Sequence, residues 1–159
     1  MDYLWTPWRY QYITTSDKQQ GCVFCEAAQD PDDHRSLIVH RAIRNFVILN
    51  RYPYTSGHLM VVPFCHVASL LDLDAETLSE MMLLAQAAEK HLRALYRPDG
   101  LNIGMNVGKS AGAGIAGHLH LHALPRWTAD SNFMTVIGET RLLPEDLDTS
   151  WQRLSAAFR

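Results

Sequence analysis

The sequence of 159 residues lacks a long apolar run and lacks a large charge of either sign. Without a stretch of about 20 apolar residues it contains no candidate transmembrane helix, and its first residues lack the basic and apolar segments of a signal peptide. A formal net charge of −3 gives no electrostatic footprint for general nucleic-acid binding. We therefore expect a cytoplasmic protein that binds neither membrane nor nucleic acid, and that holds any anionic ligand with local groups.

Cysteine is scarce as well, with three thiols in the chain. In a reducing compartment this number argues against a disulfide framework. Cys22 and Cys25 form a Cys-x-x-Cys sequence, which suits either a redox dithiol or half of a tetrahedral zinc site. A redox pair is expected near a strand, helix, strand pattern, and none is evident here. Two reduced cysteines without a metal are the remaining alternative.

The composition that is present is that of a globular protein. Hydrophobic residues make up 47% and charged residues 19%, and this length suits one domain with a real core. We expect a single domain over residues 1–159, with an aromatic N-terminal arm over 1–20 and a C-terminal extension over 138–159. The aromatic side chains of the arm could lie over the body of the protein or a partner subunit, whereas a disordered leader is the alternative.

Apolar periodicity predicts an α+β fold with an antiparallel sheet. Residues 44–50 and 57–63 have the pattern of two strands joined by a loop, which predicts an antiparallel hairpin. Residues 101–107 alternate in the same way, and residues 133–137 predict a further strand.

Two helices are predicted. Apolar residues at helical spacing predict one long helix over residues 74–96, capped by Asp72 or Asp74 and ended near Pro98. Its methionines are better explained as core filling than as a binding groove. A second helix is predicted to begin near Pro144 and to run toward the C-terminus.

A glycine-rich loop followed directly by three alternating histidines is the most informative stretch. If residues 118–123 form a strand, the three imidazoles share one face. Imidazole can act as nucleophile, proton carrier or metal ligand, and glycine loops can turn backbone N–H groups toward a phosphate. The pairing predicts phosphate chemistry with a nucleophilic imidazole, although three solvated histidines or a purely metal-binding row are alternatives. The residues are Gly108, Gly112, Gly114, Gly117, His118, His120 and His122.

The sequence Gly117 to Arg126, G-H-L-H-L-H-A-L-P-R, resembles the signature of the histidine triad (HIT) superfamily. Its continuation over residues 126–133, R-W-T-A-D-S-N-F, is similar to the branch that contains bacterial diadenosine tetraphosphate phosphorylases. The likeness runs from about residue 4 to residue 144. It implies a HIT-like α+β domain and a homodimer in which one sheet is continuous across both subunits, with the long helices at the interface.

The resemblance implies nucleotidyl transfer through a covalent nucleotidyl-histidine intermediate. His120 would be the nucleophile, and His122 would stabilise charge on the phosphate oxygens. The continuation after the triad favours phosphorolysis of diadenosine tetraphosphate to ADP and ATP, with inorganic phosphate as acceptor. A dinucleoside polyphosphate hydrolase, a nucleoside phosphoramidase and a non-catalytic nucleotide-binding protein are the alternatives.

The resemblance also implies substrate contacts. A polar residue at the position of Asn50 binds ribose in HIT proteins, and the amide at the position of Asn106 contacts the phosphates. Ser110 could offer a hydroxyl to the leaving group, while Gly112 and Gly114 belong to the phosphate loop. His58 matches a Gly-His pair of the family and is given no role.

A structural zinc ion is the last implication. Related proteins with Cys-x-x-Cys, including galactose-1-phosphate uridylyltransferases, bind zinc with those cysteines, a histidine at the end of a central strand and the first triad histidine. Such a closed site could contribute on the order of 10 kcal/mol to folding. The implied ligands are Cys22, Cys25, His66 and His118.

Overall fold

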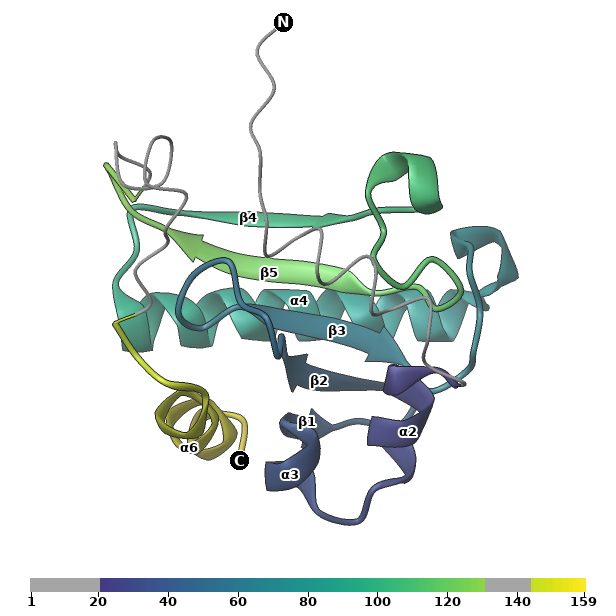
Figure 1. The fold of residues 1–159 in the computed structure, drawn as a ribbon, viewed down its shortest axis with the longest axis horizontal. Coiled ribbons are helices and arrows are strands. Elements are labelled where there is room, and N and C mark those ends of the chain that lie inside the picture. Colours follow the sequence, from purple (N-terminus) through teal and green to yellow (C-terminus); the bar gives the residue numbers. More distant parts are fainter. Residues whose placement is uncertain (1–20, 131–143) are drawn as a thin grey trace, which may run out of the picture.

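The computed structural model describes residues 21–130 and 144–159, and the expected arm over 1–20 and strand over 133–137 lie outside these ranges (Figure 1). The described strands form one five-stranded antiparallel sheet in the order β1-β2-β3-β5-β4. They are β1 Ile38–Arg41, β2 Asn45–Leu49, β3 Leu59–Pro63, β4 Gly100–Met105 and β5 Leu121–Arg126. The helices are α2 Val23–Gln29, α3 Asp33–Ser36, α4 Ala75–Tyr96 and α6 Leu147–Ala157, with 3₁₀ turns η1 Leu70–Asp72 and η2 Lys109–Ala111. An α+β fold with an antiparallel sheet, one long helix and a C-terminal helix is confirmed.

The central hairpin is confirmed, with β2 and β3 paired in register from Asn45 opposite Pro63 to Leu49 opposite Leu59. Every residue of both strands is buried. The strands are covered on both faces, which explains why their sequences are continuously apolar rather than alternating.

Helix α4 begins where predicted, because the carboxylate of Asp74 accepts a hydrogen bond from the backbone N–H of Thr77 at 2.7 Å. It ends at Tyr96, and Arg97 adopts the left-handed conformation that often closes a helix. Met81 is fully buried, but Met82 is 56% exposed. The prediction that the methionines fill the core is therefore wrong for Met82. A residue next to a core position is rotated by about 100° around the helix axis and lies on another face.

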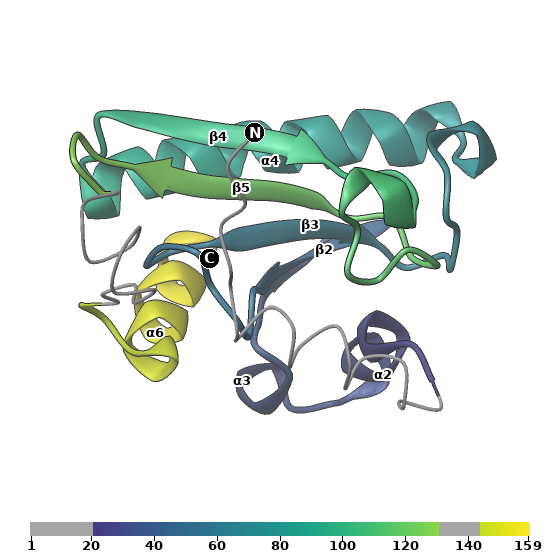
Figure 2. The same cartoon turned by 45° about the horizontal axis from the view of Figure 1, so that its top comes forward.

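Two apolar clusters lie on opposite faces of the sheet. The larger joins the inner side of α4 and Leu154 of α6 to one face of β2, β3 and β5. The smaller joins Phe24 of α2 to the other face, through Phe46, Ile48 and Met60. In Figures 1 and 2 the loop from β4 to β5 lies at the same end of the sheet as α2, whereas α6 lies at the other end.

The predicted boundaries near the triad need correction. Strand β4 ends at Met105, so Asn106 belongs to the following loop, and β5 begins only at Leu121. His118 and His120 thus precede β5, whereas the alternation predicted a strand over residues 118–123 that would include them. The final helix is confirmed as α6, with Asp146 accepting from the Thr149 N–H at its start. None of the helices formed by the described residues combines the length and the apolar content that a membrane crossing requires.

Candidate active site and metal centre

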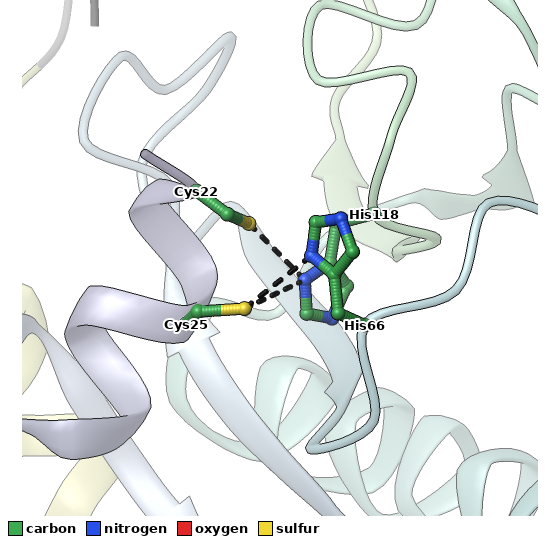
Figure 3. A group of neighbouring side chains, drawn as sticks. All are labelled: Cys22, Cys25, His66 and His118. Atoms are coloured by element: carbon green, nitrogen blue, oxygen red, sulfur yellow. Dashed lines mark hydrogen bonds between the residues drawn. The ribbon is translucent and has the colours of Figure 1, made fainter. Parts of the chain in front are cut away.

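The four predicted zinc ligands lie together at one end of the sheet (Figure 3). Cys22 is the N-cap of α2 and Cys25 lies one turn later, so both thiols point from the same side of a helix rather than from a turn. The thiol of Cys22 is 3.2 Å from Nδ1 of His118, and that of Cys25 is 3.3 Å from Nδ1 of His66. One ligand atom from each residue lies within 4.8 Å of all the others.

This donor set fits a zinc ion. Zinc–sulfur bonds of about 2.3 Å and zinc–nitrogen bonds of about 2.0 Å place tetrahedral ligands roughly 3.3 to 3.8 Å apart. Nε2 of His118 donates to the carbonyl of Pro63 at 2.9 Å, which leaves the lone pair on Nδ1 facing the thiols. Metal-binding histidines are commonly fixed in this way. Burial raises the pKa of the Cys25 thiol, and its neighbour Cys22 adds to the effect, so a bound cation would stabilise charge that the metal-free site disfavours.

His120 is buried beside this centre, with 5% of its surface exposed. Its Nδ1 lies 2.8 Å from the carbonyl of His118 and must donate to it, because a carbonyl can only accept. Burial lowers the pKa of His120, which favours the neutral ring. The remaining nitrogen, Nε2, then carries a lone pair and no proton, as a nucleophile requires.

Phe24 links the two groups of residues. Its ring centroid lies 5.4 Å from that of His118 and 5.0 Å from that of His120. Helix α2 therefore supplies both thiols and an apolar wall for the buried triad imidazole.

The protonation of His122 is set by a residue that the sequence left without a role. The backbone N–H of Tyr54 donates to Nδ1 of His58 at 3.2 Å, so a neutral His58 carries its proton on Nε2. That nitrogen lies 2.9 Å from Nδ1 of His122 and donates to it. A neutral His122 in turn carries its proton on Nε2, and its ring lies 4.9 Å from that of His120.

The imidazole rings of His58 and His122 both resist protonation. Burial, then the neighbouring His122 and His120, lower the pKa of His58 to about 3. Burial and His120 lower the pKa of His122 to about 4. At neutral pH the site therefore presents one imidazole lone pair, from His120, next to one imidazole N–H, from His122.

Asn50 joins the same network. Its amide nitrogen is 3.3 Å from Nδ1 of His58 and its oxygen accepts from the backbone N–H of Tyr52 at 2.9 Å. The structure thus brings Asn50 close to the triad through His58.

The glycine loop is less directly connected. The N–H groups of Ala111, Gly112 and Ala113 donate to carbonyls of the loop itself, at 3.0 to 3.3 Å. Ser110 is exposed and Gly114 is exposed, while Asn106 is half-buried. Within residues 21–130 and 144–159 no hydrogen bond of the structure joins Asn106 or Ser110 to a triad histidine.

Comparison with known proteins agrees with this geometry. Residues 33–129 match the HIT domain family. The chain is 39% identical over 150 residues to AP-4-A phosphorylase of Mycobacterium tuberculosis, covering 89% of this chain and 76% of the relative.

Solved structures with the same fold include a zinc-bound histidine triad family protein from Mycobacterium smegmatis. It has 29% identity and a TM-score of 0.69, over 87% of this chain and 93% of the other. A histidine triad nucleotide-binding protein from Sulfolobus tokodaii has 25% identity and a TM-score of 0.68, over 86% and 91% of the two chains.

Proposed function

The chain belongs to the HIT domain family, as an enzyme of its nucleotidyltransferase or hydrolase class, and we propose that it cleaves dinucleoside polyphosphates through a covalent nucleotidyl-histidine. The supporting observation is the pairing of tautomers at the triad. His120 presents an unprotonated Nε2 because its Nδ1 proton is held by the carbonyl of His118. His122 presents an Nε2 proton because its Nδ1 accepts from His58.

In the first step Nε2 of His120 attacks the α-phosphorus. A nitrogen–phosphorus bond forms, the bond from that phosphorus to the bridging oxygen breaks, and the leaving phosphate takes the electron pair. The Nε2 hydrogen of His122 stabilises the charge that develops on a non-bridging oxygen.

In the second step an acceptor oxygen attacks the same phosphorus, the nitrogen–phosphorus bond breaks, and its electron pair returns to Nε2 of His120. A proton carried by the acceptor leaves to the solvent. With inorganic phosphate as acceptor, diadenosine tetraphosphate yields ATP in the first step and ADP in the second. With water the second product is AMP. We favour phosphate, since a relative with 39% identity is named AP-4-A phosphorylase.

Substrate contacts are assigned as part of this proposal. Asn50 holds the ribose hydroxyls, its amide already lying beside His58. Asn106 contacts the phosphates, Ser110 serves the leaving group, and the loop containing Gly112 and Gly114 surrounds the phosphate chain. The last two contacts require the loop N–H groups or side chains to turn toward the ligand from the arrangement described above.

A structural zinc ion on Cys22, Cys25, His66 and His118 completes the proposal. It would supply no chemistry to the reaction but would tie α2 to the end of β3 and to the start of the triad. Both thiols must be reduced for this, which suits the cytoplasm.

We further propose that residues 1–159 form one domain and that two copies associate through β4 and α4. Strand β4 lies at an edge of the described sheet, where an unpaired strand can bind another. Met82 and Leu83 of α4 and Ile103 of β4 are exposed apolar side chains.

The experiment that tests the proposed activity is product analysis with diadenosine tetraphosphate, with and without inorganic phosphate. We expect ADP and ATP, formed only when phosphate is present. AMP and ATP regardless of phosphate would replace phosphorolysis by hydrolysis. In His120→Ala we expect loss of turnover with AMP binding retained, and unchanged turnover in that variant would exclude His120 as the nucleophile.

A further inference from the structure

The ring of Tyr96, at the end of α4, lies against the backbone that carries His58. Gly57 has φ +78°, and a Cβ added there would be 2.8 Å from Cε2 of Tyr96 and 3.1 Å from a methyl group of Leu92. Because His58 is the next residue, the position of the Tyr96 ring limits where the His58 imidazole can lie.

Helix α6 holds this ring in place. The hydroxyl of Tyr96 donates to the carboxylate of Glu145 at 2.6 Å. The guanidinium of Arg153 lies 4.7 Å from the centroid of the same ring and donates to the carbonyl of Leu95 at 2.8 Å. Glu145 and Arg153 also form an ion pair, and buried Ser150 donates to Glu145 at 2.7 Å. Tyr96 is thus fixed by its hydroxyl, by its ring face and by the adjacent backbone.

We propose that Tyr96, braced by Glu145 just before α6 and by Arg153 within α6, is a positioning residue that keeps His58 in reach of His122 and so keeps the reactive hydrogen of His122 directed at the substrate. The inference deepens the proposed function, on which its kinetic part rests. It assigns a task in the active site to a helix that lies outside residues 33–129, the part of the chain that matches the family. This bracing controls the distance between Nε2 of His58 and Nδ1 of His122, which is 2.9 Å.

A shift of His58 by a fraction of an ångström would weaken that contact. His122 would then be free to exchange its proton between its two nitrogens, and only one of the two tautomers presents Nε2–H to the phosphate. The expected signature is a slower chemical step with unchanged nucleotide binding, since Tyr96 itself touches neither the nucleophile nor Asn50 in the described contacts.

Three variants and one control test the inference. Tyr96→Phe and Glu145→Ala remove the hydrogen bond between the Tyr96 hydroxyl and residue 145 but keep the ring, and Tyr96→Leu removes the ring. The control is Trp151→Phe, which breaks a different anchor of α6, the hydrogen bond from Nε1 of Trp151 to the carbonyl of Ile38 at 2.7 Å. All four are measured as full-length, folded protein.

The first readout is independent of any substrate. Long-range proton–nitrogen NMR spectra of the histidine rings report which nitrogen carries the proton. In the wild type we expect one protonated and one accepting nitrogen in both His58 and His122. In Tyr96→Leu we expect the nitrogen chemical shifts of the His58 and His122 rings to move toward the average of the two tautomers. In Trp151→Phe we expect these shifts to remain unchanged.

The second readout is the single-turnover rate of nucleotidyl-histidine formation, with the AMP dissociation constant measured beside it. Small misplacements of catalytic groups are costly, so we expect the rate to fall about threefold in Tyr96→Phe and about tenfold in Tyr96→Leu, with AMP affinity unchanged. Wild-type nitrogen shifts in Tyr96→Leu, or an equal rate loss in Trp151→Phe, would overturn the inference. If Tyr96→Leu does not fold, the other two variants decide. If the wild type turns over no nucleotide, the proposed function fails while the NMR shifts still decide this inference.

Discussion

The hydrogen on Nε2 of His58 determines what the triad can do. It is fixed there by the backbone N–H of Tyr54, which occupies the other ring nitrogen, and it obliges His122 to direct its own hydrogen away from His58. His58 has no exposed surface, so no water can replace it in this role. The backbone N–H of Tyr54, together with the amide of Asn50, thereby sets the tautomer of His122, which lies 64 positions after His58 in the chain.

Removing this donor should slow the reaction more than it weakens binding, which it affects only through the contact of His58 with Asn50. In His58→Ala we expect turnover to fall by up to about 100-fold, because His122 loses the hydrogen bond that orients its own donor, and losing one preorganised oxyanion donor costs about 100-fold or more. His58→Gln keeps an N–H that can reach Nδ1 of His122 and should recover part of the loss. Turnover and AMP affinity are measured for both variants, and equal turnover in His58→Ala and the wild type would contradict the role of His58.

The same pair predicts how stability depends on pH. The pKa values of His58 and His122 are lowered to about 3 and about 4, whereas in the unfolded chain both titrate near 6.5. Between these values the unfolded state binds more protons, so the free energy of unfolding is full above about pH 6.5 and falls as pH decreases toward 4. At about 1.4 kcal/mol per pH unit for each ring, the window from pH 6.5 to 4 gives a loss on the order of 7 kcal/mol for the two rings together.

Urea denaturation at a series of pH values checks this expectation. The titratable side chains that face His58 are His122, His120 and Tyr54, and none of them is a carboxylate that could offset a charged ring. His58→Gln should be less stable at pH 7.5 but should lose less stability on acidification. A variant with the same pH slope as the wild type would show that His58 does not remain neutral in the folded protein.

The residues of the site were predictable from sequence to different degrees. The triad and the four cysteine and histidine ligands stand out because several unusual residues recur at fixed spacing. His58 does not, since one histidine after a glycine carries no spacing signal. Its role depends on the pairing of β3 with β5, which places Met60 opposite His122, and such long-range register is not encoded in any local pattern.

Helix α2 is the element that would gain most from the proposed zinc ion. It has seven residues and a single buried side chain, Phe24, which is too short for an isolated helix to be stable in water. A zinc ion bound by the two thiols and by His66 and His118 would hold this helix against the rest of the protein.

Zinc removal should therefore loosen α2 and the triad together. A chelator should lower the melting temperature by about 10 °C or more, because structural zinc contributes much more than 1 kcal/mol. Cys22→Ser should abolish zinc retention, measured by elemental analysis of purified protein. Cys65→Ser is the matched control, since Cys65 is exposed and outside the cluster. A zinc-free wild type with the same melting temperature would contradict the proposed metal centre.

Elements were predicted well where local signals are strong and poorly where they are not. Helix α4 has 22 residues, an N-cap and an apolar stripe, and the β2 and β3 hairpin has two buried runs. Strand β1 and helix α3 have four residues each, too few for a period to be recognised. The alternation at residues 118–123 predicted a strand three residues too early, because a tertiary contact, Leu119 N–H to the carbonyl of Val67 at 2.7 Å, replaces sheet pairing there.

The residues that follow the triad, from Arg126 to Asp130, also stabilise the end of the sheet. The guanidinium of Arg126 forms an ion pair with Asp130 and donates to the amide oxygen of Asn102 at 2.8 Å. It thus fastens the end of β5 to β4.

At the scale of the whole molecule, the proposed dimer would use the edge of the sheet and the outer side of α4. Ile103 projects from edge strand β4 and is 41% exposed, while Leu83 of α4 is 62% exposed. An edge strand left unpaired in solution is prone to indiscriminate association, and natural proteins cover or charge such edges. The side chain of Ile103 is apolar rather than charged, which supports the proposed pairing of β4 with a second copy.

A charge placed on this surface should separate the copies. We expect the wild type to sediment as a dimer, at twice the 18.0 kDa of the chain, and Ile103→Lys and Leu83→Glu to shift it toward the monomer mass. Leu71→Glu is the control, because Leu71 is 94% exposed but lies in η1, away from β4. If these variants remain folded, their triads should be intact, so turnover measured at low protein concentration distinguishes a site that is complete in one copy from one that needs both. A wild-type monomer at sedimentation equilibrium, or a dimer that Ile103→Lys and Leu83→Glu leave unchanged, would place assembly elsewhere on the molecule.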